Sequence, residues 1–209
     1  SFKSSREIFK NPFTLTNINF GNYVKLFVTQ DYELYFLNSV IISFSAIILI
    51  LFSTSLASYT LGKYQFKGNK QIYFYFLLGL MIPIRLGTIN IMQMFLKLNL
   101  FNSLLSLIII YSAMGIPAGI LIFTGFIREI PEELSDAARI DGYSETNIFI
   151  HIIIPLLSPA IVVVAVYNLM PIWNNFWFPL ILINNDRLMP IPLATARLFG
   201  KHETDPYRQ

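Results

Sequence analysis

Few side chains in this sequence have the types and spacing that an enzyme site requires. The two histidines, His151 and His202, stand far apart, and neither belongs to a His-Glu-x-x-His pattern that holds zinc. Gly62-Lys63 and Gly200-Lys201 lack the upstream glycine and the following Ser or Thr of a phosphate-binding loop. The chain has no cysteine, which excludes a thiol nucleophile and Cys-ligated metals. We therefore expect no catalytic residue, no metal site and no cofactor held by this chain.

The most distinctive spacing begins at Pro131. A proline suits the start of a helix, and the acidic residues that follow it face the positive end of the helix dipole. Leu134, Ala137 and Ala138 then fall on one helical face, at i, i+3 and i+4. Two alanines exposed on a short helix would let another backbone approach closely. Gly142 can adopt the left-handed conformation that ends a helix.

A second helix is predicted directly after this turn. Ser144 can cap it, and Glu145 lies in its first turn. Pro155 removes a backbone N–H, so it should kink or end the helix close to the membrane. A helix, tight turn and helix at a surface suit docking into a groove of a partner. The alternative is an amphipathic connection between helices that has no partner.

The rest of the chain has the composition of a membrane protein. Hydrophobic residues make up 55% and charged residues only 13%, against roughly 25% charge in soluble domains. A net charge of +3 is too small to indicate nucleic-acid binding. Apolar residues run continuously instead of alternating, which favours helices over barrel strands. The sequence predicts an all-α, polytopic transmembrane helix bundle with four spans, near 36–61, 71–93, 104–127 and 156–180.

Charges in the connections predict the topology. Gly62–Lys70 contains three lysines and no acid, which is typical of a cytoplasmic loop. The connection at 128–147 would then be cytoplasmic too. We expect an extracytoplasmic segment at 1–35, a transmembrane core at 36–183, and a second extracytoplasmic segment at 184–209. No signal peptide is expected, because a basic segment followed by a short apolar one is absent at the start.

The loop resembles that of a known family. Permeases of ATP-binding cassette (ABC) importers carry the pattern E-A-A-x3-G-x9-I-x-L-P. This chain has Asp136-Ala137-Ala138, then Gly142, then Ile152, Ile154 and Pro155, all at the same spacing. It departs from the pattern at Asp136 and Ile154. Three other stretches are similar to the smaller permease of maltose-type importers: Asn38-Ser39, Trp173–Pro179 and Pro192–Arg197.

The resemblance implies a MetI-like permease fold of six spans, of which this chain would lack the first and the last. It also implies that the loop is the coupling helix, which seats in a cleft of a separate ABC ATPase dimer that binds ATP and Mg. A second, homologous permease and an extracytoplasmic solute-binding protein would complete the assembly in the plasma membrane of a bacterium. The residues implied in ATPase coupling are Glu133, Asp136, Ala137, Ala138, Asp141, Gly142 and Pro155.

A solute path is predicted from side-chain chemistry alone. Sugars contact amide, hydroxyl and aromatic groups, so such side chains on protein-facing sides of spans are candidates. The densest group is Tyr167, Asn168, Trp173, Asn174 and Asn175, with Trp177 beside it. Asn168 is the first choice, because an amide inside a span is costly without a partner. The alternative is a belt of aromatic side chains at the membrane boundary.

Other classes of function remain open at this stage. The solute of such an importer could instead be glycerol phosphate or an oligopeptide. An ion-driven secondary transporter would place acidic residues within its spans, and none falls inside the four predicted ones. A purely structural membrane scaffold would not need the spacing of the 131–155 loop.

Overall fold

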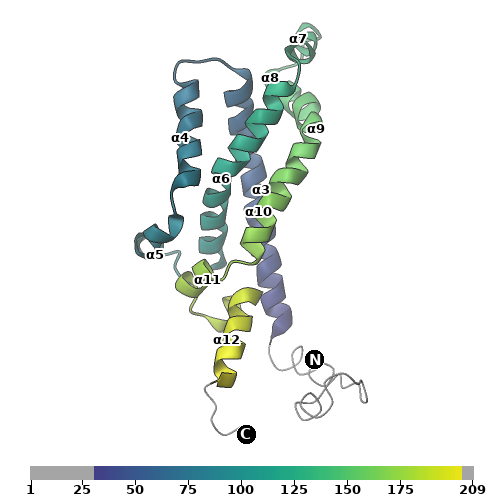
Figure 1. Ribbon diagram of the computed structural model, residues 1–209. Helices are drawn as coiled ribbons and strands as arrows, with labels where there is room; N and C mark the ends of the chain where they lie inside the picture. Colours follow the sequence, from purple (N-terminus) through teal and green to yellow (C-terminus); the bar gives the residue numbers. More distant parts are fainter. Residues whose placement is uncertain (1–30, 204–209) are drawn as a thin grey trace, which may run out of the picture.

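The computed structural model describes residues 31–203, and the side chains of residues 31–197 (Figure 1). All regular structure in that range is helical, which confirms the predicted all-α class. The predicted N-terminal segment, apart from residues 31–35, and the last six residues lie outside the described part. Three long helices lie side by side in Figure 1: α3 (Tyr32–Lys63), α6 (Leu104–Glu129) and α10 (Ser158–Trp173).

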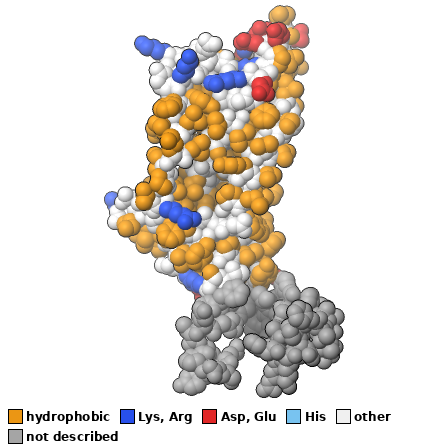
Figure 2. Space-filling model, in the orientation of Figure 1, with side chains coloured by type: hydrophobic (Ala, Val, Ile, Leu, Met, Phe, Trp, Pro, Cys, Tyr) orange, Lys and Arg blue, Asp and Glu red, His pale blue; other side chains and the backbone are white. Residues whose placement is uncertain are grey.

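Two of these helices, α3 and α6, are long and apolar enough to cross a membrane by themselves. Two further candidates are bent pairs. The helical segments Asn69–Met81 and Ile84–Lys97 meet at 82°, and Glu145–Leu156 and Ser158–Trp173 meet at 71°. The described part therefore has two clear spans, or four if each bent pair is counted as one. Figure 2 shows hydrophobic side chains covering the middle of one face.

The second predicted span is interrupted. Helix α4 (Asn69–Met81) ends two residues before Pro83, which supplies no N–H. A short 3-10 turn, η1 (Ile84–Gly87), then leads into α5 (Thr88–Lys97), which turns away from α4. The predicted span near 71–93 is therefore not one continuous helix. Arg85 is exposed in η1, with its guanidinium 5.7 Å from the ring of Trp177.

The fourth predicted span, at 156–180, also differs from the structure. A small helix, α8 (Glu145–Ile148), continues into a π-helical turn, η2 (Phe149–Ile153), and α9 (Ile154–Leu156). The wide turn precedes Pro155, where a regular helix would need the missing N–H. Helix α10 then ends at Trp173, and the Asn175 side chain accepts a hydrogen bond from the Phe178 N–H (3.1 Å) in the first turn of α11 (Trp177–Leu182).

Small residues let α3, α6 and α10 pack closely. A Cβ added to Gly115 of α6 would lie 2.3 Å from Ile50 Cδ1 on α3 and 2.6 Å from Asn168 Oδ1 on α10. One added to Gly119 would lie 2.8 Å from Thr54 Cγ2 on α3. Such close approach maximises van der Waals contact, which drives helix association in lipid.

Hydroxyl groups join the same helices. Ser58 of α3 donates to the Ile120 carbonyl of α6 (3.3 Å). Ser112 of α6 donates to its own helix at Ile108 (2.7 Å) and lies 3.5 Å from the Ala46 carbonyl of α3. These polar side chains therefore find partners inside the bundle.

The end of the bundle farther from α7 is closed by polar contacts with α3. Asn38 donates to the carbonyls of Arg187 (2.8 Å) and Met189 (3.1 Å). Ser39 accepts from the Ile191 N–H (2.9 Å) at the start of α12 (Ile191–Glu203). A second 3-10 turn, η3 (Asp186–Leu188), lies between α11 and α12. The Asn38-Ser39 pair therefore holds the 187–191 segment against the first long helix.

Gly115→Ala should destabilise the bundle by about 1–3 kcal/mol, since an extra methyl group would overpack the contact with Ile50 and Asn168. Gly125→Ala is the matched control, because nothing lies within 4 Å of a Cβ added there on the same helix. Thermal unfolding of the purified protein in detergent compares the two. Equal stability of both variants would contradict the close packing of α3, α6 and α10.

Candidate functional site

A short helix, α7 (Glu132–Ile140), projects from one end of the bundle (Figure 1). It begins one residue after Pro131, and Glu132 and Glu133 occupy its first turn, as predicted. Both carboxylates lie at the positive end of the helix dipole and are exposed. The predicted helix is therefore present, and it lies beyond the ends of α3, α4 and α6 in Figure 1.

The turn after α7 has the geometry of a Schellman motif. Gly142 has φ +86°, the Gly142 N–H donates to the Arg139 carbonyl (3.1 Å), and the Tyr143 N–H donates to the Ala138 carbonyl (2.9 Å). Ser144 then caps α8 by accepting from the Asn147 N–H (3.3 Å). The predicted left-handed turn and N-cap are both confirmed.

The two alanines of α7 do not share one exposed face. Ala137 is exposed, whereas Ala138 is buried, as is Ser135 three residues before it. The prediction that both alanines are exposed is therefore wrong. Ala138 supplies the carbonyl of the Schellman turn and packs inward, so Ala137 alone of the pair offers close approach to another chain.

Large apolar side chains accompany Ala137 at the surface. Ile140 is 87% exposed, and Leu134 and Tyr143 are close to half exposed. Acidic side chains lie among them. We call these residues the α7 surface: Glu133, Leu134, Ala137, Ile140, Asp141 and Tyr143. Ile140 and Tyr143 were not predicted as part of this surface. An isoleucine between the charged residues Arg139 and Asp141, at a helix end, nevertheless indicates an exposed apolar side chain.

One carboxylate joins α7 and α8 to the end of α3. Glu145 Oε1 accepts from Arg139 Nε (2.7 Å), and Oε2 accepts from the hydroxyls of Tyr59 (3.0 Å) and Tyr64. Arg139 Nη1 also donates to Asp136 Oδ1 (2.6 Å). The acid of the sequence motif is thus part of a chain of charge-assisted hydrogen bonds that reaches the bundle.

A second bond fixes the other side of α7. Lys63 Nζ, at the last residue of α3, donates to the carbonyl of Ile130 (2.7 Å), just before α7 begins. The segment from Ile130 to Glu145 is therefore tied to the C-terminal end of α3 at both ends. We call Tyr59, Lys63, Tyr64, Arg139 and Glu145 the α3 clamp.

The clamp keeps Glu145 ionised. Hydrogen bonds, first from Arg139 and then from Tyr64, lower the pKa of Glu145 to about 2. The carboxylate is therefore charged throughout the physiological pH range. Protonation near neutral pH cannot release α7 from α3 through this group.

The remaining predicted coupling residue, Pro155, lies apart from this surface. It is exposed on α9, after the π-helical turn. His151, in that turn, is exposed, with Nδ1 3.1 Å from the Asn147 carbonyl. The structure thus gathers the predicted residues from Glu133 to Gly142 and leaves Pro155 at the bend.

The predicted solute-path residues are spread over several environments. Tyr167 and Asn174 are exposed, and Asn175 accepts from the Phe178 N–H in the first turn of α11. Trp177 is exposed and donates to Thr88 Oγ1 (3.1 Å). Asn168 is buried and donates to the Val164 carbonyl of its own helix (2.8 Å). The Asn168 amide therefore packs within the bundle here, and its contact with a solute stays a prediction.

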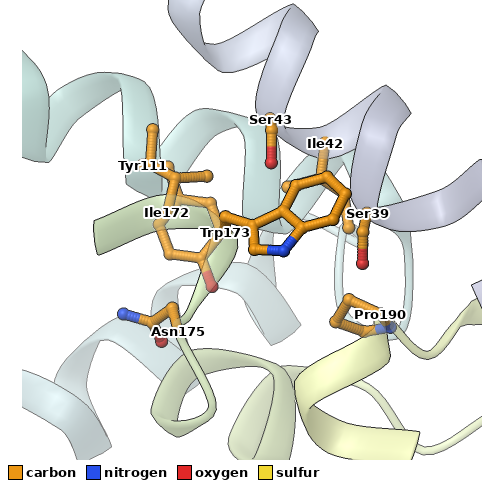
Figure 3. A pocket seen from close by; sticks show the side chains of 8 residues that line it. All are labelled: Ser39, Ile42, Ser43, Tyr111, Ile172, Trp173, Asn175 and Pro190. Carbon is orange, nitrogen blue, oxygen red and sulfur yellow. The ribbon is translucent and has the colours of Figure 1, made fainter. Parts of the chain in front are cut away.

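Trp173 and Asn175 line a small cavity with residues of α3 and α6 (Figure 3). It offers about 10 Å³ to the centre of a water-sized sphere, which is room for about one water molecule. The buried hydroxyl of Tyr111 faces this space and has no hydrogen-bond partner among the described atoms. In this conformation the cavity is too small for a sugar.

Comparison with known proteins decides the family. Residues 53–199 match the model of the binding-protein-dependent transport system inner membrane component, and this match covers more than half of the chain. The chain belongs to this family. The predicted relation to ABC permeases is thereby confirmed.

Two proteins similar to this chain are named for the transport of oligosaccharides. The chain is 33% identical over 188 residues to the diacetylchitobiose uptake system permease protein NgcG of Streptomyces coelicolor, covering 90% of this chain and 62% of that protein. It is 32% identical over 203 residues to the arabinooligosaccharides transport system permease protein AraQ of Halalkalibacterium halodurans, covering 95% of this chain and 72% of that protein. The chain thus spans only part of these relatives.

A solved structure supports the family's fold in this chain. A chain of a bacterial ABC transporter involved in the import of the acidic polysaccharide alginate superposes with a TM-score of 0.76 at 18% identity. The match covers 93% of this chain and 66% of that one. The arrangement of helices is therefore that of an ABC transporter chain.

Gly142→Val should strain the turn after α7 by at least about 1 kcal/mol, because a β-branched residue disfavours positive φ. A Cβ at this position meets no atom within 4 Å, so the cost is conformational only. Gly142→Asn is the control, since asparagine tolerates the left-handed region. We expect normal membrane insertion of both variants and loss of substrate-stimulated ATP hydrolysis by the assembled transporter for Val alone. Unchanged stimulation in the Val variant would contradict a role for this turn.

The pH dependence of the clamp follows from the lowered pKa of Glu145. A carboxylate with a depressed pKa stabilises the folded chain above its ordinary pKa of 4.5 and loses that contribution as pH falls toward 2. The difference in thermal midpoint between wild type and Glu145→Gln should therefore stay constant between about pH 8 and pH 5 and shrink below about pH 4. A difference that varies near neutral pH would contradict the assigned bonds.

Proposed function

We propose that this chain is the membrane core of a permease subunit of an ABC importer, and that α7 is its coupling helix. In this proposal the α7 surface docks on a separate ABC ATPase dimer, which binds ATP and Mg, and this chain catalyses no reaction. The α7 end would be cytoplasmic and the α12 end extracytoplasmic, in the plasma membrane of a bacterium. A second, homologous permease and a solute-binding protein would complete the importer.

The observation that carries the proposal is the α3 clamp. A helix that transmits motion from an ATPase must be rigidly joined to the spans that it moves. Lys63 holds the start of the α7 segment and Glu145 holds its end, both at the C-terminal end of α3. Because α3 packs along α6 and contacts α10, a displacement of α7 would be passed to the long helices together.

The α7 surface also suits docking. Ile140 and Leu134 expose apolar area that water solvates poorly, while Glu133 and Asp141 supply charges that fix orientation. Exposed Ala137 would allow close approach of the partner at the centre of this surface. Leu134, Ile140 and Tyr143 together expose apolar area on one short element, and such grouped area is typical of protein interaction sites.

We infer that the solute is a sugar or oligosaccharide. The support is the naming of the relatives, which are permeases for diacetylchitobiose and arabinooligosaccharides. An importer for glycerol phosphate or an oligopeptide is the other candidate, since the pocket residues would come from two permeases. Uptake of labelled oligosaccharides by cells with and without this gene separates the two. Uptake of a labelled peptide or glycerol phosphate alone would overturn the sugar assignment.

Ala137→Arg should abolish coupling without unfolding the chain, because Ala137 is exposed and its replacement meets only the docking partner. We expect substrate-stimulated ATP hydrolysis by the reconstituted importer to fall roughly tenfold or more. A loss of about 1.4 kcal/mol of docking energy weakens the complex with the ATPase tenfold. Ala137→Ser is the matched control and should retain coupling. The proposal fails if the Arg variant couples normally in a correctly assembled complex.

A further inference from the structure

A basic hollow lies at the turn between α3 and α4. It offers about 640 Å³ to the centre of a water-sized sphere, and it is lined within residues 61–71 and by Arg128. Lys67, Lys70 and Arg128 contribute positive charge, and no acidic residue is among the lining ones. In Figure 2 several Lys and Arg side chains lie at this end on the side of α4, while most acids gather on the side of α7.

These cations are not neutralised within the described part of the chain. The ion pairs there involve Arg139 and Arg197 only, so none includes a cation of the hollow. Arg128 lies over the ring of Tyr73, 5.0 Å from its centroid, which holds the guanidinium in place and leaves its donors available. Lys63 differs from these residues, since its ammonium is already bonded to the Ile130 carbonyl.

Apolar surface continues from the hollow along α4. The first residues of α4 line the hollow, and the helix makes its main contacts with α6. None of its residues is buried, and Phe74 and Tyr75 are 59% and 72% exposed. A cationic recess therefore opens onto a helix face that would lie in hydrocarbon. A soluble anion would make no use of that face.

We propose that this hollow binds the headgroup of an anionic phospholipid, with the acyl chains along α4. The phosphodiester would accept charge-assisted hydrogen bonds from Lys67, Lys70 and Arg128. Basic pockets beside membrane helices recognise anionic headgroups in this way. The inference rests on the membrane orientation given under the proposed function, but not on the docking of α7.

The test uses the full-length permease, assembled with its partner subunits, in nanodiscs. Discs contain phosphatidylcholine alone or mixed with phosphatidylglycerol, and native mass spectrometry measures the phosphatidylglycerol retained after release. Lys67→Gln/Lys70→Gln should reduce the preference for phosphatidylglycerol roughly tenfold or more. Lys67→Arg/Lys70→Arg should preserve it. Lys97→Gln, at the exposed end of α5, removes a charge far from the hollow and should leave it unchanged.

Several results would overturn the lipid assignment. The assignment is wrong if the Gln double variant keeps its full preference for phosphatidylglycerol. It is also wrong if Lys97→Gln loses as much of that preference as the double variant. Inorganic phosphate added to the discs would displace the lipid completely, which would indicate a site for a soluble anion. Crosslinking of Lys67 to an acidic residue of the ATPase would assign the hollow to a protein contact. ATP-hydrolysis coupling, measured in phosphatidylcholine discs, reports separately on the proposed function.

Discussion

The structure depends on one polar junction at the end of α3. There, Lys63 bonds the start of the segment that carries α7, and Tyr59 and Tyr64 bond its end at Glu145. Glu145 is the central group, because a single carboxylate accepts from three donors on α3, on the α3–α4 connection and on α7. Without this junction α7 would be joined to the bundle only through its two short connections.

The bundle behind the junction has a closely packed centre. Close contacts at Gly115 and Gly119 lock α3 and α6 together, so the clamp acts on a pair of helices. Bends of 82° and 71° separate α4 from α5, near Pro83, and α9 from α10, just after Pro155. Prolines prevent continuous hydrogen bonding at these places. The chain therefore combines a closely packed centre with bent helix pairs at its edges.

The loop could be predicted closely because its signals are local. A left-handed turn requires Gly142, and Ser144 caps whatever helix follows, regardless of the rest of the molecule. The span ends could not be predicted as well. Apolar residues continue past Met81 and past Trp173, so hydropathy predicted spans that run through both positions. In the structure α4 ends at Met81, shortly before Pro83, and α10 ends at Trp173. Composition measures solubility in lipid, whereas helix ends depend on backbone hydrogen bonds.

The sequence by itself determined the membrane class, the helical architecture, the α7 loop and, through its motif, the family. Tertiary structure decided which side of each helix is buried and which is exposed. It buried Ala138 and left Ala137 and Ile140 exposed, and it turned Asn168 toward α6. It also brought Glu145 to Tyr59, 86 residues earlier in the chain. Local spacing cannot encode such pairs, because they exist only after the long helices have packed.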